Sequence, residues 1–333
     1  MNRKEKIAIC FLVTKNIVNL DVWEKWWNGY EDFINIYAHF SVIGNITQPV
    51  LLKNRVEPVP TKWGDISLVI AEGQLYKEAL KNPSNKFFAL VSDTCIPVRS
   101  FEYTYKRLFN DSSHSRPRGL LGYRVIDRFS PDDASPFTPS DECNRSIEKS
   151  GVYGRTRRGK NQVYASDQWK ILNRSNAKAF LKMLEDKEAY LLYTNCIKIV
   201  PDSLAPDELM YVNWMNKKTK GQLKKHFRDF ASTFVDFKGK AIHPINYKQM
   251  TKGISDEICY SNTLFARKFP DPIKNRLIRQ TPVVCYKKRS IQRGVMKGAI
   301  SPPRQKRKSR KNRKKSSSPR RRNSNKKRKR RSK

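Results

Sequence analysis

Blocks of apolar residues alternate with amphipathic blocks along the first hundred positions. Three runs rich in apolar residues have the length of buried strands: Ile7–Val13, Phe33–Phe40 and Lys86–Val91. Between them, Asp21–Phe33 and Asp65–Leu80 place apolar residues at helical spacing. Strands of this kind that alternate with helices indicate an α/β fold, with a mainly parallel sheet flanked by helices on both faces.

Weaker signals predict further detail. Asp21 is expected to be the N-cap of the first helix, and Val50–Leu52 is expected to begin a short strand. A longer amphipathic segment predicts a helix over Ser175–Glu188. In a parallel sheet the functional loops are expected at the carboxyl ends of the strands.

Composition predicts the division of the chain into domains. Residues 1–272 carry the strand and helix patterns, but periodicity fades over 110–162, where we expect a long functional loop or insert. Residues 273–300 are expected to be a linker. Residues 301–333 contain 19 Lys and Arg and no acidic residue, with few apolar side chains to bury, so a disordered basic tail is predicted.

The charge balance adds a second class of function. The chain has 69 Lys and Arg against 30 Asp and Glu, a net charge of +39. A tail this basic binds nucleic-acid phosphates or anionic membrane surfaces, and serines near Pro319 would lower its charge if phosphorylated. A nucleic-acid-binding or structural protein acting through the tail is therefore the alternative function. Residues 1–300 contain no helix-turn-helix, zinc-finger or RNP pattern.

Cysteine spacing and the N-terminus are less informative. The six cysteines form no CxxC pair, so the spacing predicts no zinc site, and it leaves disulfides open. Cys10 and Cys95 lie in apolar runs and are expected to be core residues. The run Ile7–Val13 is too short for a signal peptide or a membrane span, so neither a leader nor an anchor is expected.

An adjacent acid pair behind a proline carries the clearest chemistry. Pro206-Asp207-Glu208 precedes a mostly apolar segment, which is typical of a helix start, where acids complement the helix dipole. Such acids often only cap and stabilise the start of the helix. A carboxylate at a helix N-terminus can also face a cleft and act there as a general base. The motifs that accompany the pair decide between these two interpretations.

Five motifs in order resemble the core-2/I-branching β-1,6-N-acetylglucosaminyltransferases (glycosyltransferase family 14), closest to the plant-type branch. They are Lys62–Val69 (KWGDISLV) with Ala71-Glu72, Leu90–Pro97 (LVSDTCIP), Ser166–Trp169 (SDQW) with Asn173-Arg174, Pro206–Glu208 (PDE) and Leu264–Phe269 (LFARKF). Together they extend over about four fifths of the chain.

The resemblance implies a GT-A-type fold and inverting transfer of a sugar from a UDP-sugar, with N-acetylglucosamine the leading candidate, to a glycan hydroxyl. It implies that Glu208 is the general base and that Asp207 caps the helix or orients a loop. Lys268 matches the family's phosphate-binding lysine. No Asp-x-Asp is present, so we expect no metal and no cofactor besides the donor.

The resemblance also suggests the remaining site residues. For the donor they are His39, Trp63, Ser92 and Arg267, and for the acceptor Trp169, Phe234 and Asp236. The chain departs from the animal enzymes at two points. Ile245, after His243-Pro244, stands where they have a second phosphate-binding arginine, so that cation is missing or supplied by Lys248 or Arg267. His39 replaces their nucleoside-binding Asp, as in plant-type members.

These departures leave a third interpretation open, a degenerate glycosyltransferase fold used only for binding. Family members are usually Golgi membrane proteins. Without an anchor we expect a cytoplasmic protein whose tail directs it to the nucleus or to membrane surfaces. The composition of the tail is similar to that of anchorless enzymes of large DNA viruses, which predicts a viral origin.

Overall fold

Strand β1 (Lys6–Leu12) lies inside a six-stranded sheet of order β10-β5-β9-β3-β1-β2 in the computed structural model. The structure describes residues 4–42, 44, 46–110, 117–126, 154–155, 161–192, 205–237, 244–273 and 285. The chain divides into Met1–Lys287 and Lys288–Lys333, and every described residue belongs to the first unit. The predicted basic tail lies outside the described residues.

The direction of the strands bears out the predicted fold class. The other strands are β2 (Ile34–His39), β3 (Asn85–Ser92), β5 (Gly119–Leu120), β9 (Ile171–Asn173) and β10 (Phe227–Arg228). β1 pairs in parallel with β2 and β3, and β5 with β10, whereas β9 is antiparallel to β3 and β5. All strands except β9 therefore run in one direction, and the fold is an α/β fold with a mixed, mainly parallel sheet.

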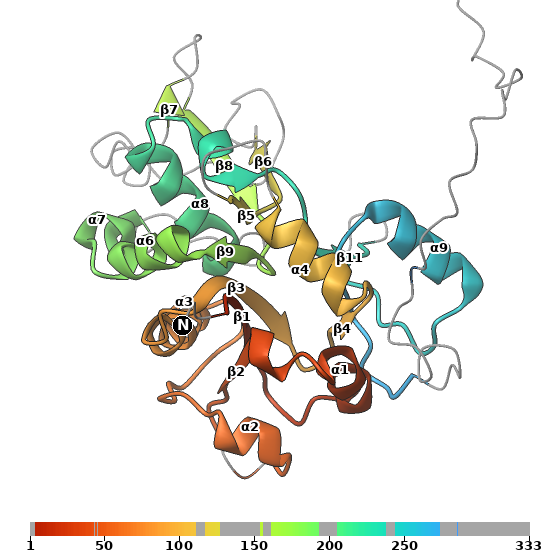
Figure 1. Cartoon of the computed structure of the whole chain (residues 1–333). Helices are drawn as coiled ribbons and strands as arrows, with labels where there is room; N and C mark the ends of the chain where they lie inside the picture. Colours follow the sequence, from red (N-terminus) through yellow and green to blue (C-terminus); the bar gives the residue numbers. More distant parts are fainter. Residues whose placement is uncertain are drawn as a thin grey trace, which may run out of the picture. The chain divides into compact units, whose positions relative to one another are not determined.

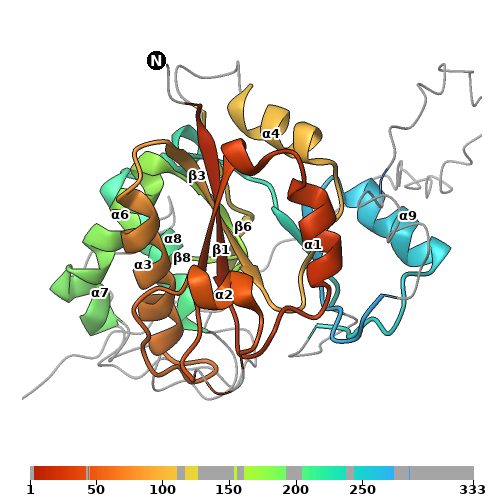
Figure 2. The same ribbon diagram turned by 60° about the horizontal axis from the view of Figure 1, so that its bottom comes forward.

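Helices cover both faces of this sheet (Figures 1 and 2). The helices of the described residues are α1 (Leu20–Trp27), α2 (Pro49–Lys53), α3 (Ser67–Leu80), α4 (Phe101–Phe109), α6 (Arg174–Leu184), α7 (Lys187–Leu192), α8 (Pro206–Lys218) and α9 (Lys252–Ser261). Alternate residues of β1 explain the two layers. Ala8 and Cys10 pack in one core with residues of α3, α6 and α8, while Ile7, Ile9 and Phe11 pack in the other with the tryptophans of α1.

Two smaller sheets and two short 3₁₀ turns complete the described residues. β4 (Ile96–Pro97), β11 (Thr233–Val235) and β12 (Phe265–Arg267) form one sheet, and β6 (Tyr123–Ile126), β7 (Gly154–Arg155) and β8 (Asn161–Ser166) form the other. The 3₁₀ turns are Glu31–Phe33 and Leu223–Lys225. Residues 110–162, predicted as a long loop or insert, contain the described strands β5, β6 and β7.

Local predictions at helix ends were partly wrong. Asn19, not Asp21, is the N-cap residue of α1, and Asp21 lies in the first turn. Val50–Leu52 belongs to α2 instead of a strand, because Pro49 occupies the first helical position. The predicted helix over Ser175–Glu188 is divided between α6 and α7.

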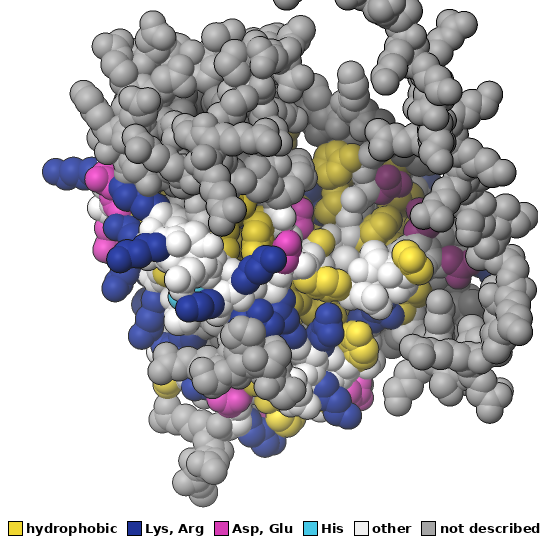
Figure 3. All heavy atoms as spheres, turned by 90° about the horizontal axis from the view of Figure 1, so that it is seen from above, with side chains coloured by type: hydrophobic (Ala, Val, Ile, Leu, Met, Phe, Trp, Pro, Cys, Tyr) yellow, Lys and Arg dark blue, Asp and Glu magenta, His cyan; other side chains and the backbone are white. Residues whose placement is uncertain are grey.

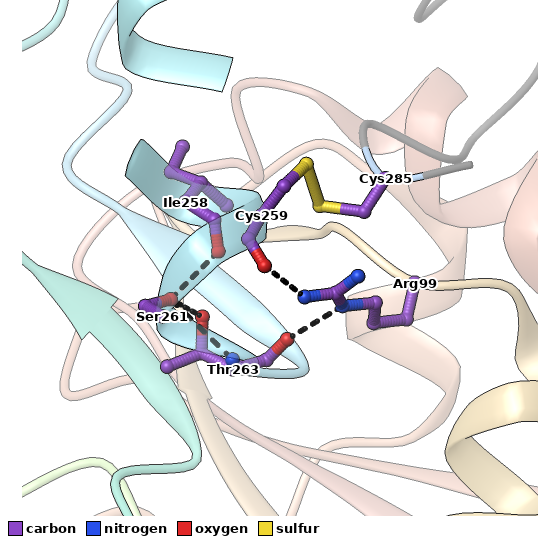
Figure 4. Close-up of a disulfide and its surroundings, with 6 residues drawn as sticks. All are labelled: Arg99, Ile258, Cys259, Ser261, Thr263 and Cys285. Carbon is purple, nitrogen blue, oxygen red and sulfur yellow. Dashed lines mark hydrogen bonds between the residues drawn. A yellow bond between two sulfur atoms is a disulfide. The ribbon is translucent and has the colours of Figure 1, made fainter. Parts of the chain in front are cut away.

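A disulfide joins Cys259 of α9 to Cys285 (Figure 4). The Arg99 guanidinium lies against the same turn, donating to the carbonyls of Cys259 (2.8 Å) and Thr263 (3.2 Å). Cys10 and Cys95 are buried free thiols, as predicted. The crosslink therefore ties Cys285 to the part of the fold that carries β12.

Replacing both Cys259 and Cys285 by serine is expected to lower the free energy of unfolding by about 3 kcal/mol, because the crosslink closes a loop of 26 residues. Urea denaturation measures this. Tyr260→Phe, at an exposed neighbour of Cys259, is the matched control and should leave the midpoint unchanged. An unchanged midpoint in the double-serine variant would contradict a stabilising crosslink.

Candidate functional site

The candidate site lies at the carboxyl edge of the main sheet. β1, β2 and β3 are parallel and end together at Leu12, His39 and Ser92. β9 runs the opposite way, so it begins at this edge: the Leu90 N–H donates to the Lys170 carbonyl over 3.0 Å. Open α/β sheets bind their ligands at this edge.

Each of the five motifs, or the residue next to it, contributes one charged side chain at this edge. We call the group the charge cluster: Glu72 of α3, Asp93 after β3, Lys170 before β9, Asp207 of α8 and Arg267 of β12. Lys170 and Glu72 form an ion pair at 3.0 Å. Lys170 and Arg267 favour the charged form of Asp207, and Asp93 and Asp207 favour that of Arg267. The fold therefore gathers charged side chains from distant motifs.

Lys170 is the anchor of the charge cluster, with 0% of the residue exposed. Its Nζ lies 3.0 Å from Glu72 Oε1 and donates to Glu72 Oε2 (3.1 Å) and to the Gln168 carbonyl (3.0 Å). The Tyr76 hydroxyl donates to Glu72 Oε1 over 2.8 Å. Burial raises the pKa of Glu72, while Lys170 acts in the opposite direction. Removing either partner would leave the other charge buried and unpaired.

Asp207 lies in the first turn of α8 and is buried in the protein. Ala205, not Asp207, is the N-cap residue, but the backbone N–H groups of Asp207 and Glu208 favour the charged form of the Asp207 carboxyl. Only 5% of Asp207 is exposed, and among the described residues its Oδ1 has no hydrogen-bond partner. Burial raises the pKa of this carboxyl, and Lys170 and Arg267 oppose that shift. Asp207 thus interacts with both cations of the cluster.

Arg267 and Trp169 are stacked, although the resemblance assigned one to the donor and the other to the acceptor. The guanidinium carbon lies 4.5 Å from the centre of the indole ring. Burial lowers the pKa of Arg267, while Asp93 and Asp207 favour its charged form. Because Trp169 is 6% exposed and is stacked against a cation, it offers little surface to a sugar.

Glu208 lies in the first turn of α8, beside Asp207 but partly exposed. Two contacts hold this helix to β8. The Ser166 hydroxyl donates to the Glu208 carbonyl (3.1 Å). The amide side chain of buried Asn213 exchanges two hydrogen bonds with the backbone of Tyr164, at 2.9 and 2.8 Å. The Glu208 backbone is therefore held by Ser166 of a neighbouring motif, and the helix by Tyr164 of the same strand.

Lys268 and the predicted acceptor residues meet at the β11–β12 pair. The register places Phe234 beside Ala266, one residue before the Arg267-Lys268 pair. Tyr247, which sequence reasoning missed, links the two sides: its hydroxyl donates to Asp236 Oδ2 (2.6 Å) and its N–H to the Lys268 carbonyl (2.8 Å). No motif signal marks this tyrosine.

His39 is held in the core, with 1% of the residue exposed. Its Nε2 accepts a hydrogen bond from the Val59 N–H over 3.0 Å, and burial lowers its pKa to about 4, so the ring is neutral near pH 7. This contact fixes the segment after α2. The His39 ring therefore has almost no exposed surface with which to make the predicted contact to the nucleoside.

The other predicted donor residues lie in different settings. Ser92 is buried, with its hydroxyl 3.2 Å from both the Thr94 hydroxyl and the Cys95 sulfur. Trp63 is 67% exposed before α3. Lys248 is exposed, and His243 lies outside the described residues. The predicted donor residues are therefore divided between a buried position, Ser92, and an exposed one, Trp63.

Asp93 is a site residue that the sequence analysis quoted within a motif but did not select. Its Oδ2 accepts hydrogen bonds from the N–H (3.3 Å) and hydroxyl (3.0 Å) of Thr14. These bonds join the ends of β1 and β3. Its position directly after a buried strand was the signal in the sequence that could have identified it, because functional residues of α/β folds often follow the strands.

Surface charge is dispersed on the described part of the face drawn in Figure 3, where Lys and Arg side chains lie among apolar ones. Within the described ranges, no three His, Cys, Asp or Glu side chains are arranged to share a metal ion. Within the same ranges, every helix is too short or too polar to cross a bilayer.

Comparisons with known proteins identify related enzymes. The model of the Core-2/I-Branching enzyme family matches residues 7–261. Glycosyltransferase BC10 of Oryza sativa subsp. japonica is 28% identical over 191 residues. That match covers 55% of this chain and 41% of the rice protein, so the chain matches less than half of its relative's length.

Proposed function

Because the chain belongs to the Core-2/I-branching enzyme family, we propose that it is a glycosyltransferase that moves a sugar from a UDP-sugar to a glycan hydroxyl with inversion. One observation carries the proposal. The charge cluster joins all five family motifs at the carboxyl edge of the sheet, where α8 also presents the partly exposed Glu208.

In the proposed reaction the acceptor hydroxyl oxygen attacks the anomeric carbon of the donor. A new C–O bond forms as the bond between that carbon and the phosphate oxygen breaks. The Glu208 carboxylate takes the hydroxyl proton, and the electron pair of the broken bond leaves with the nucleoside diphosphate. One attack from the face opposite the leaving group inverts the anomeric centre.

The charge that develops on the diphosphate requires a cation. Arg267 lies near Asp93 and Asp207, which favour its charged form, and its guanidinium lies against Trp169. Lys268 is the next residue and is partly exposed, so we assign it the main phosphate contact. A preorganised cation at this point is worth a large part of the rate enhancement. On this proposal the reaction needs no metal ion.

The acceptor side is proposed to form around Phe234, with Asp236 as a hydrogen-bonding group. Phe234 is partly buried and retains an aromatic face on which a sugar ring can stack. The Tyr247 hydroxyl holds Asp236 at 2.6 Å, which fixes the orientation of that carboxylate. N-acetylglucosamine is the proposed sugar on the basis of the family resemblance.

Donor binding is expected to give a selective thermal shift. UDP-N-acetylglucosamine at a hundred times its Kd should stabilise the protein by about 2.7 kcal/mol, whereas GDP- and CMP-sugars should not. Differential scanning fluorimetry on the full chain measures the shift. A shift with GDP- or CMP-sugars alone would overturn the proposed donor.

The net charge of +39 supports the alternative, a protein that binds nucleic acid through residues 301–333. A variant that ends before Pro302 separates the two functions. The proposed transferase retains donor binding and transfer without the tail. Loss of nucleic-acid binding in that variant, with no response to any nucleotide sugar in the full chain, would favour the alternative.

A further inference from the structure

Trp169 presents the face of its indole ring to the Arg267 guanidinium and has little other exposed surface. The guanidinium carbon lies 4.5 Å from the ring centre, and 6% of the tryptophan is exposed. Arg267 is partly exposed, but its Nε is buried and has no hydrogen-bond partner among the described residues. Contact with the indole therefore fixes the plane of a guanidinium whose Nε has no hydrogen bond to do so.

The backbone of Trp169 is connected to the strand that carries Arg267. The hydroxyl of Ser232, which is 1% exposed, donates to the Trp169 carbonyl over 2.8 Å. The Ser232 carbonyl accepts hydrogen bonds from the N–H groups of Leu264 (2.9 Å) and Phe265 (3.1 Å), at the start of β12. One buried serine thus joins the two backbones on which the stacked side chains stand.

The stacked guanidinium suits a phosphate ligand. A guanidinium has five N–H donors in one plane, and only one of them belongs to Nε. The four donors on the terminal nitrogens match phosphate oxygens in pairs, which a lysine ammonium cannot do. A cation whose plane is already fixed also loses less conformational entropy when it binds. Arg267 directly precedes Lys268, the proposed phosphate contact, so both cations belong to the same end of β12.

From this arrangement we propose that Trp169 is a positioning residue on the donor side, which holds the Arg267 guanidinium so that its terminal N–H groups bind the diphosphate beside Lys268. The resemblance assigned Trp169 to the acceptor instead. The inference deepens the proposed function and rests on the proposed use of a nucleoside diphosphate donor. It requires that changes at Trp169 alter the affinity for UDP and leave acceptor binding unaffected.

Trp169→Leu tests this by removing the aromatic face while keeping an apolar side chain in the core. We expect the affinity for UDP to fall by about 10- to 30-fold, because a desolvated cation–π contact is lost. The donor KM should rise in proportion, with the acceptor KM unchanged. Trp169→Phe restores a ring face and should bind UDP within about threefold of the wild type. Calorimetry with UDP and initial rates at varied acceptor concentration measure these quantities.

The matched control is Trp214→Leu. Trp214 is also 6% exposed and also has a cation over its ring, because Lys218 Nζ lies 5.3 Å from the ring centre at the end of α8. The control loses a tryptophan and a cation–π contact outside the candidate site, so its affinity for UDP should be unchanged. A raised acceptor KM in Trp169→Leu, with wild-type affinity for UDP, would overturn the proposal, since the residue would then serve the acceptor.

A double-mutant cycle asks whether Trp169 acts through Arg267. In the Arg267→Ala background, Trp169→Leu should cause little further loss of UDP affinity, because the indole then has no cation to hold. A further loss by the same factor would overturn the proposal. If Trp169→Leu does not fold, Arg267→Lys replaces it, since lysine keeps the charge without the planar stack, and the same fall in UDP affinity is expected. Wild-type affinity in Arg267→Lys would contradict the proposal.

Two results separate this inference from the proposed function. A wild-type chain that binds UDP but transfers no sugar would sink the proposed function and leave the UDP affinities of the variants to decide the role of Trp169. A wild-type chain that does not bind UDP would overturn both.

Discussion

Glu208→Gln is expected to lower kcat for sugar transfer by about 10²–10⁴-fold, because glutamine cannot take the proton of the acceptor hydroxyl. The affinity for UDP should stay within about twofold, since the base acts on the acceptor and not on the donor phosphates. The fold should persist, because Glu208 is partly exposed and its backbone carbonyl keeps the bond from Ser166.

Initial-rate measurements with a saturating donor check this, with UDP affinity measured by calorimetry. Glu188→Gln is the matched control: this exposed glutamate of α7 pairs with Lys217, and its loss should leave kcat unchanged. Wild-type kcat in Glu208→Gln would remove Glu208 from the mechanism. A loss of UDP affinity equal to the loss of rate would show that the residue serves the donor.

Lys268→Ala is expected to lower kcat by about 10²–10³-fold and to weaken UDP binding, because the proposed cation for the leaving diphosphate is removed. Transfer by the wild-type protein should persist in excess EDTA. Lys252→Ala, at the exposed start of α9, is the control for the loss of one positive charge.

Two results would contradict this assignment. If chelation stops turnover and manganese restores it, a metal and not Lys268 neutralises the diphosphate. If Lys268→Ala binds UDP with wild-type affinity while Arg267→Ala does not, the phosphate contact belongs to Arg267. That outcome would also separate Arg267 from its stacking role on Trp169.

Elements formed from long, regular patterns were predictable from sequence. The apolar run of β1 and the helical spacing of α3 leave few alternatives, because each buries one or two complete faces. The start of α8 at Pro206 was likewise predictable from the sequence. Short segments were not: three apolar residues at Val50–Leu52 fit a strand or a helix, and β5 contributes only Gly119–Leu120 to the sheet.

The motifs located the candidate site, but its interactions were not predictable. In a chain with 69 Lys and Arg, any one lysine is expected at the surface, and nothing local marks Lys170 as buried. Its partner Glu72 is 98 positions away, so the pair exists only through the packing of α3 against the start of β9. Likewise, the stacking of Arg267 on Trp169 crosses about a hundred residues of sequence.

A crystal structure of the chain with bound UDP tests the central claim most directly. The account predicts the diphosphate at the carboxyl edge of the sheet, with a phosphate oxygen within hydrogen-bond distance of Lys268 Nζ and no metal ion between them. It also predicts the Glu208 carboxylate on the open side of the donor site. A diphosphate bound away from this edge, or held there by a metal on carboxylates, would contradict the account.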